Sequence, residues 1–269
     1  MPSRQNAQVV TEIEREAALH ASIEAFEPVV PYKPIYLQSC PKSGTMLTRN
    51  IYLHFVGLER AHLPLLFELH EMPAEPNRWH FFYGHLPGVP GIFNRFARYH
   101  RVLIWRHPID NVIALAKACF DPRTDREDYM EMQSKGMRVI DAIPLIAHGY
   151  AIANRRMEPF YKAYEEFYLD WVESASSIIE FNQMMDATRG GLSPGKAVQM
   201  LAAMGLPYTR AWSDRVRAGS SAELSSTFVA NTSADQRQEQ RAVARQELLK
   251  SLQSAPLHVA EEMARHLHD

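Results

Sequence analysis

The chain has 269 residues, 46% of them hydrophobic, which is enough to bury a substantial core, and we expect one α/β domain. The formal net charge of −2 arises from scattered acidic and basic residues, without the basic stripe that a nucleic-acid backbone requires. Nucleic acid is therefore not expected as a partner, and any anion site must be local.

The two cysteines, Cys40 and Cys119, lie far apart and lack the spacing of metal ligands, so we expect reduced, partly buried thiols. The first thirty residues carry charges throughout, and no apolar run approaches the ~20 residues of a membrane-spanning helix. These features predict a cytoplasmic protein without a membrane partner. We expect a helical extension over residues 1–30, followed by the main domain over residues 31–269.

Short apolar runs alternate with longer amphipathic stretches, a pattern typical of a central parallel sheet flanked by helices. Strands are predicted at residues 34–40, 79–84, 101–106 and 177–182. Helices are predicted at residues 44–57, from Pro108 onward, at 195–207 and from about 236. Between residues 125 and 172 the sequence is typical of helices and is rich in Met and aromatic residues.

The stretch SCPKSGTMLTRN, residues 39–50, links the first predicted strand to the first predicted helix. The first N–H groups of a helix are unpaired and its dipole is positive there, so an anion gains several hydrogen bonds at once. Gly44 permits close approach, Lys42 supplies charge, and Ser43 and Thr45 supply hydroxyls. The Walker order, in which Lys and then Ser or Thr directly follow a glycine, is absent. The sequence therefore predicts a phosphate site without a metal-bound triphosphate.

Three short motifs follow predicted strands in order: PKSGT at 41–45, GHLP at 84–87 and RHPIDNV at 106–112. The first resembles the 5′-phosphosulfate loop of sulfotransferases that use 3′-phosphoadenosine 5′-phosphosulfate (PAPS). The second resembles the segment with that family's catalytic base, and the third resembles its 3′-phosphate segment. The resemblance covers residues 33–120, with a weaker echo at 177–207.

This resemblance implies a P-loop-like sulfotransferase that moves a sulfonate group from PAPS to a hydroxyl or amine of a small molecule, leaving 3′-phosphoadenosine 5′-phosphate (PAP). His85 would be the general base, a role that suits a group whose pKa lies near 7. Lys42 would stabilise the leaving phosphate, and no metal is required. The implied nucleotide-binding residues are Lys42, Ser43, Gly44, Thr45, Met46, Leu47, Arg106, Arg217 and Gly219.

Several positions depart from the pattern of the familiar cytosolic enzymes. Met46 and Leu47 replace a Thr-Trp pair, Tyr83 replaces a second lysine, and Ala114 replaces a serine that contacts the 3′-phosphate. The late Arg-Lys-Gly segment has no clean match, and RVRAGSS at residues 215–221 is its nearest equivalent. These departures leave open how the 3′-phosphate is held.

Two other functions remain open from the sequence. One is a phosphate-loop kinase or NTPase, which the absent Walker order disfavours. The other is a non-catalytic nucleotide-binding protein of the same fold, which Ala114 favours and the intact Lys42, His85 and Arg106 disfavour. The Met and aromatic residues of 125–172 are interpreted mainly as core, with an apolar acceptor pocket as the alternative.

Overall fold

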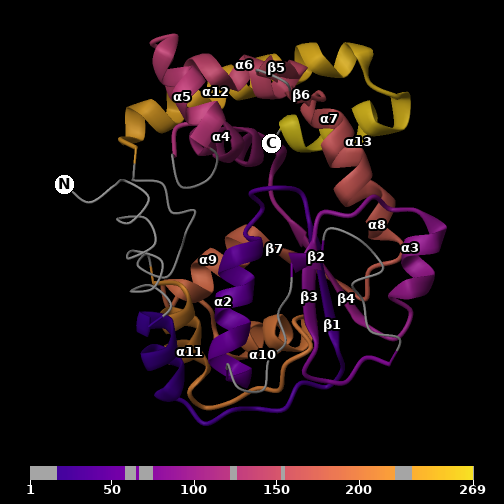
Figure 1. Cartoon of the computed structure of the whole chain (residues 1–269), viewed down its shortest axis with the longest axis vertical. Coiled ribbons are helices and arrows are strands. Elements are labelled where there is room, and N and C mark those ends of the chain that lie inside the picture. The colour runs from indigo at the N-terminus through magenta and orange to yellow at the C-terminus, as the bar shows by residue number, and fades with distance from the viewer. Residues whose placement is uncertain are drawn as a thin grey trace.

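The computed structural model describes residues 17–57, 65–66, 75–121, 126–152, 155–221 and 232–268. The described residues form a five-stranded parallel sheet in the order β2-β3-β1-β4-β7 (Figure 1). The strands are β1 (Ile35–Ser39), β2 (Leu65–Leu66), β3 (Phe81–Gly84), β4 (His100–Trp105) and β7 (Ser177–Glu180). The predicted fold class, a central parallel sheet flanked by helices, is confirmed.

The central strand β1 pairs with β3 on one side and with β4 on the other. Gln38 near the end of β1 lies opposite Gly84 of β3 and Leu103 of β4. Because all these pairings are parallel, the residues that follow the strands meet at one edge of the sheet. In open α/β sheets, ligands bind at this carboxyl edge.

The side chains of β1 alternate between two cores, one on each face of the sheet. Ile35 and Leu37 pack into a core with α2, α9, α10 and α11, whereas Tyr36 packs with Phe96 and Trp171 on the opposite face. Figure 1 shows these two groups of helices on either side of the strands. Their bounds are α2 (Thr45–Val56), α9 (Phe181–Thr188), α10 (Pro194–Ala203), α11 (Trp212–Gly219), α3 (Pro90–Arg95) and α8 (Asp170–Val172).

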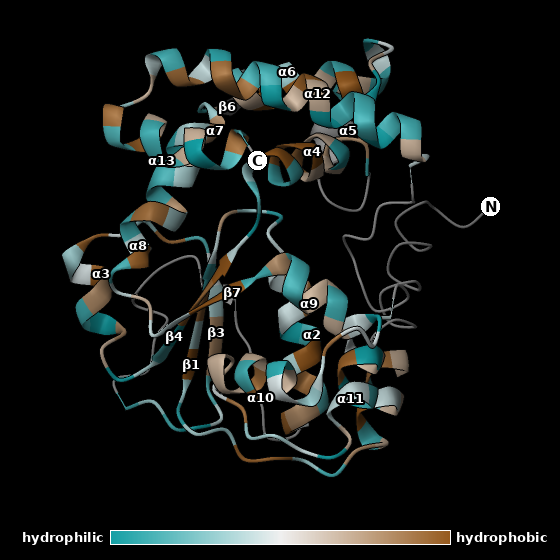
Figure 2. Cartoon of the chain, turned by 180° about the vertical axis from the view of Figure 1, so that it is seen from behind, coloured by the Kyte–Doolittle hydropathy of each residue, from teal (hydrophilic) through white to brown (hydrophobic). Residues whose placement is uncertain are grey.

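A third layer, the helical cap, lies beyond the carboxyl edge of the sheet (Figure 2). It consists of α4 (Pro108–Ala118), α5 (Arg126–Ser134), α6 (Val139–His148), α7 (Phe160–Tyr164), α12 (Ala234–Ser251) and α13 (Leu257–Leu267). Its own core includes Ile143, Leu248 and Met263, all fully buried. A π-helical turn (Glu165–Leu169) joins α7 to α8, and a 3₁₀ turn (Leu252–Ser254) joins α12 to α13.

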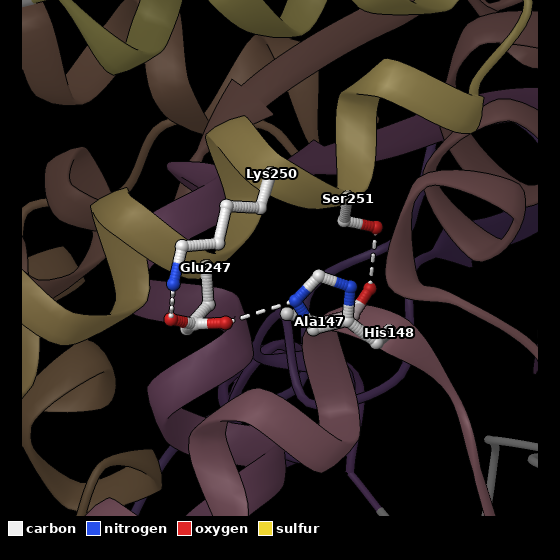
Figure 3. A network of polar contacts seen from close by, with 5 residues as sticks. All are labelled: Ala147, His148, Glu247, Lys250 and Ser251. Atoms are coloured by element: carbon white, nitrogen blue, oxygen red, sulfur yellow. Dashed lines mark hydrogen bonds and ion pairs between the residues drawn. The ribbon is translucent and has the colours of Figure 1, made fainter.

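Polar contacts fix α12 to the end of α6 (Figure 3). His148 Nε2 lies 2.9 Å from one oxygen of Glu247, and Lys250 Nζ donates to the other over 2.7 Å. Ser251 Oγ donates to the carbonyl of Ala147 over 2.7 Å. These contacts set the position of α12, which also forms part of the cavity described below.

The predicted strands and helices agree with the structure except in three segments. The strand predicted at 177–182 ends at Glu180, because Phe181 begins α9. The helical segment predicted at 125–172 contains an antiparallel hairpin of β5 (Tyr150–Ile152) and β6 (Arg155–Met157), which the sequence analysis missed. The helix predicted at 195–207 is α10, which ends at Ala203 and is followed by Gly205 with φ of 72°.

The described part of the N-terminal extension contacts the main domain. Residues 17–24 are helical, and Ser22 Oγ lies 3.0 Å from His54 Nε2. Arg215 donates to the Glu27 carbonyl over 2.6 Å. Residues 1–16 lie outside the described part, and the boundary between 1–30 and 31–269 stays a prediction.

Both cysteines are buried free thiols, as predicted. Among the described residues, no helix is long and apolar enough to cross a membrane. The same ranges contain no group of three or more His, Cys, Asp or Glu residues arranged to hold a metal ion.

Candidate functional site

A cavity of about 1220 Å³ opens at the carboxyl edge of the sheet, under the helical cap. Loops after three neighbouring strands contribute Lys42, His85 and Arg106 to its wall. Phe181, directly after β7, forms another part of the wall. The remaining wall comes from α2, α4, α9, α12 and the end of α11, so the cavity collects residues from most of the chain.

Two residues of the loop between β1 and α2 have a left-handed backbone conformation. Lys42 has φ of 65° and Gly44 has φ of 108°, and Lys42 is the non-glycine residue with positive φ in the described ranges. Arg106 donates to the Lys42 carbonyl over 2.7 Å, which stabilises this conformation. A Cβ on Gly44 would lie 2.5 Å from the Phe181 ring, so the position requires glycine.

The start of α2 offers unpaired N–H groups to the cavity. Thr48 N–H makes the first intrahelical bond, to the Gly44 carbonyl over 3.0 Å, so those of Thr45, Met46 and Leu47 have no acceptor within the helix. All three residues line the cavity, and the first turn of the helix carries no acidic side chain. The positive end of the helix dipole adds to this donor set, which is suited to an anion.

The two loop hydroxyls have different surroundings. Thr45 lines the cavity, and its Oγ1 lies 2.6 Å from Ser39 Oγ. Ser43 is buried, and its hydroxyl donates to Asn111 Oδ1 over 3.2 Å. Ser43 therefore ties the loop to α4 behind the cavity wall, and its side chain is not among the lining residues.

His85 is held in one tautomer by its contact with β1. Its Nδ1 lies 2.6 Å from the carbonyl of Ser39, and because a carbonyl only accepts, Nδ1 carries the proton. Burial lowers the pKa of His85, the hydrogen bond to Ser39 opposes this, and the charge of Lys42 lowers the pKa further. The imidazole is therefore neutral at pH 7, and Nε2 keeps a lone pair able to accept a proton.

Burial also lowers the pKa of the two cations nearest the loop. For Lys42, the charge of Asp121 opposes the effect of burial. For Arg106, burial lowers the pKa to about 10 and Asp110 opposes it, so the guanidinium stays charged at neutral pH. Its Cζ lies 4.2 Å from the centre of the Phe181 ring.

Arg106 has donor capacity that the described residues do not use. Its Nε is buried and has no hydrogen-bond partner among them, although one terminal nitrogen donates to Lys42. A buried guanidinium N–H without an acceptor is costly, and an anionic ligand in the cavity would supply the acceptor.

The chain matches no known family model and no curated protein. Among solved structures it is similar to the mouse sulfotransferase SULT7A1 complexed with PAP, with a TM-score of 0.50 and 13% identity. That alignment covers 93% of this chain and 94% of the mouse chain. The chain has a sulfotransferase-like fold. At this identity the similarity concerns the fold, and the roles of individual residues depend on the site itself.

On this sulfotransferase-like fold, most of the predicted site residues meet at the cavity. Those that line it are Lys42, Gly44, Thr45, Met46, Leu47, His85, Arg106 and Gly219. Arg217 does not line it, and its side chain is mostly exposed, 3.8 Å from Asp214. Gly219 also has a packing role, because a Cβ there would lie 2.7 Å from Cα of Ile51 in α2.

Several positively charged cavity residues were not predicted from the sequence. They are Lys117, Arg189, Arg237 and Arg241. Lys117 could have been found, because it follows Asp110 and Ala114 at helical spacing on one face of α4. Arg237 and Arg241 could not, because no local pattern indicates that α12 packs over this edge of the sheet.

The aromatic residues between 125 and 172 belong mainly to cores. Tyr161, Tyr164 and Trp171 are buried in two hydrophobic clusters, and no described residue of this segment lines the cavity. Phe167 comes nearest to the site, with its ring centre 6.3 Å from that of His85. The interpretation as core is therefore favoured over that of an acceptor pocket for this segment.

Proposed function

We propose that this chain is a PAPS-dependent sulfotransferase that transfers a sulfonate group to a hydroxyl or amine of a small molecule. The observation that carries the proposal is the convergence of His85, the Lys42 loop and Arg106 on one cavity. A neutral base, an anion-binding helix terminus and a charged guanidinium are the parts that this transfer needs.

The groups on the wall of the cavity support this choice of nucleotide. The N–H groups of Thr45, Met46 and Leu47, together with Lys42, would hold the 5′-phosphate end. Arg106 would bind the 3′-phosphate through its remaining donors. Ligand pockets typically measure about 300–1,000 Å³, so a cavity of about 1220 Å³ leaves room for an acceptor beside the nucleotide.

PAPS, when bound, supplies a sulfonate group joined to a good phosphate leaving group. Nε2 of His85 would accept the proton of the acceptor hydroxyl or amine, while the bond from Nδ1–H to Ser39 keeps the ring oriented. Lys42 and the start of α2 would stabilise the negative charge that develops on the departing phosphate. Removing one such donor typically costs on the order of 100-fold or more in rate. The proposal needs no resident metal.

Sulfonate transfer from ³⁵S-labelled PAPS to a mixture of phenols, alcohols and amines tests the activity. The wild-type chain should label at least one acceptor, and His85→Ala should lose about 100-fold or more of that rate, as expected for loss of a general base. His20→Ala, at an exposed histidine on the N-terminal helix, is the matched control and should keep the rate. Equal labelling by His85→Ala would remove the proposed base, and turnover of ATP with magnesium instead would point to a kinase.

A further inference from the structure

The charge of the cavity differs in sign from that of the whole chain. The chain has a formal net charge of −2, whereas the cavity wall contains six Lys and Arg residues and two Asp residues. The acidic residues are Asp110 and Asp186. Three of the cations come from different parts of the fold: Arg106 from the loop after β4, Lys117 from α4 and Arg237 from α12. The wall therefore attracts anions more strongly than the fold as a whole.

Lys117 projects from the same face of α4 as the residue that departs from the sulfotransferase pattern. Asp110, Ala114 and Lys117 occur at positions i, i+4 and i+7 of this helix, and all three line the cavity. Ala114 has no hydroxyl to offer a phosphate. One turn further along, Lys117 has a longer, charged side chain, whose Nζ donates to Thr232 Oγ1 over 3.3 Å.

Helix α12 brings further cations over the same wall. Arg237 and Arg241 are one helical turn apart and both line the cavity. Arg241 forms an ion pair with Asp110. The acidic neighbour Asp110 is therefore already engaged by Arg241. In the described ranges no carboxylate forms an ion pair with Lys117 or with Arg237.

Electrostatics support a shared anion among these groups. Burial lowers the pKa of Lys117, the positive charges of Arg106 and Arg237 lower it further, and Asp110 opposes them. Cations that influence one another in this way repel, and a multiply charged anion between them would relieve the repulsion. A phosphate monoester fits, because it carries about −1.5 to −2 charge at pH 7 and three acceptor oxygens.

We infer that Lys117 and Arg237, together with Arg106, bind the 3′-phosphate of the nucleotide and make this chain select PAP over 5′-AMP. The inference rests on the proposed function. It answers how the 3′-phosphate is held despite Ala114 and without a clean late Arg-Lys-Gly segment. Arg217, the sequence-based candidate for that segment, is mostly exposed and does not line the cavity.

Calorimetric titration with PAP and with 5′-AMP tests this assignment. We expect Lys117→Gln and Arg237→Gln each to weaken PAP binding about tenfold or more, as for loss of one charged hydrogen bond. The affinity for 5′-AMP should change by less than about twofold, because these residues contact only the 3′-phosphate. Arg245→Gln, at an exposed position two turns further along α12, is the matched control and should bind PAP as the wild type does.

The outcomes separate this inference from the proposed function. If the wild type prefers PAP over 5′-AMP and both variants keep that preference, the inference is wrong while the proposed function stands. If the wild type binds PAP no better than 5′-AMP, both are wrong. Lys117→Arg keeps the charge and should keep most of the PAP affinity. If Lys117→Arg and Lys117→Gln lose PAP affinity equally, the role of Lys117 is structural, and the inference fails for that residue.

Discussion

His85 combines a fixed tautomer with a lowered pKa, and both affect how its activity depends on pH. The pKa lies below the ordinary value of 6.5, chiefly because of burial. The active form is the neutral one, so activity should be full above pH 6.5 and should fall only as pH drops through the lowered pKa. A profile of kcat/KM against pH should show this acidic limb below 6.5. A limb centred well above 6.5 would contradict the role of His85.

Gly44 is the residue on which the loop geometry depends most. Gly44→Ala would place a Cβ 2.5 Å from the Phe181 ring in a backbone with φ of 108°. We expect at least a tenfold loss of PAP affinity, measured by calorimetry, because the loop must shift away from the helix terminus. The matched control is Gly195→Ala in α10, where a Cβ would meet no atom within 4 Å. If Gly44→Ala binds PAP as tightly as Gly195→Ala, the loop does not form the phosphate site.

At the residue scale, the sequence was sufficient to predict the site residues that lie next to the end of a strand. Lys42, His85 and Arg106 each lie within a motif that follows a strand, and parallel pairing brings such positions together. The orientation of Ser43 toward Asn111 could not be predicted, because it depends on the packing of α4 against the loop. Arg237 was missed for a similar reason, since its position depends on a contact between distant helices.

At the scale of elements, α11 and α2 depend on close backbone contact. A Cβ on Gly219 would lie 2.7 Å from Cα of Ile51 and 2.8 Å from its N. We therefore expect Gly219→Ala to lower the free energy of unfolding by about 1–3 kcal/mol, the usual cost of overpacking. Denaturant unfolding measures this change. Gly91→Ala in α3, where a Cβ would meet nothing within 4 Å, is the control and should be nearly neutral. Equal stability of the two variants would contradict the packing role.

The accuracy of the predicted strands and helices depended on the length and regularity of the apolar pattern in each segment. The strand β1 and the helix α2 have clear apolar periodicity and were predicted nearly to their ends. The short hairpin of β5 and β6 has three residues in each strand, too few for alternation to be visible inside a helical region. The predicted strand at 177–182 was too long because Phe181, although apolar, starts α9 and lies against Arg106.

At the scale of the whole molecule, the helical cap has its own core but also completes the cavity. Leu248 of α12 is fully buried in that core, so Leu248→Ala should cost about 2–5 kcal/mol. Because α12 also carries Arg237, we expect PAP to raise Tm less in this variant than in the wild type. Thermal unfolding with and without PAP measures both effects. An unchanged Tm shift by PAP would mean that α12 does not contribute to the nucleotide site.

The central claim is that the cavity binds a nucleotide that carries a 3′-phosphate, and calorimetric titration of the wild-type protein tests it most directly. PAP, 5′-AMP and ATP would each be titrated with and without magnesium, and no knowledge of the acceptor is needed. We predict that PAP binds more tightly than 5′-AMP or ATP and that magnesium does not change its affinity. Tighter binding of ATP that requires magnesium, or no binding of PAP, would contradict the claim.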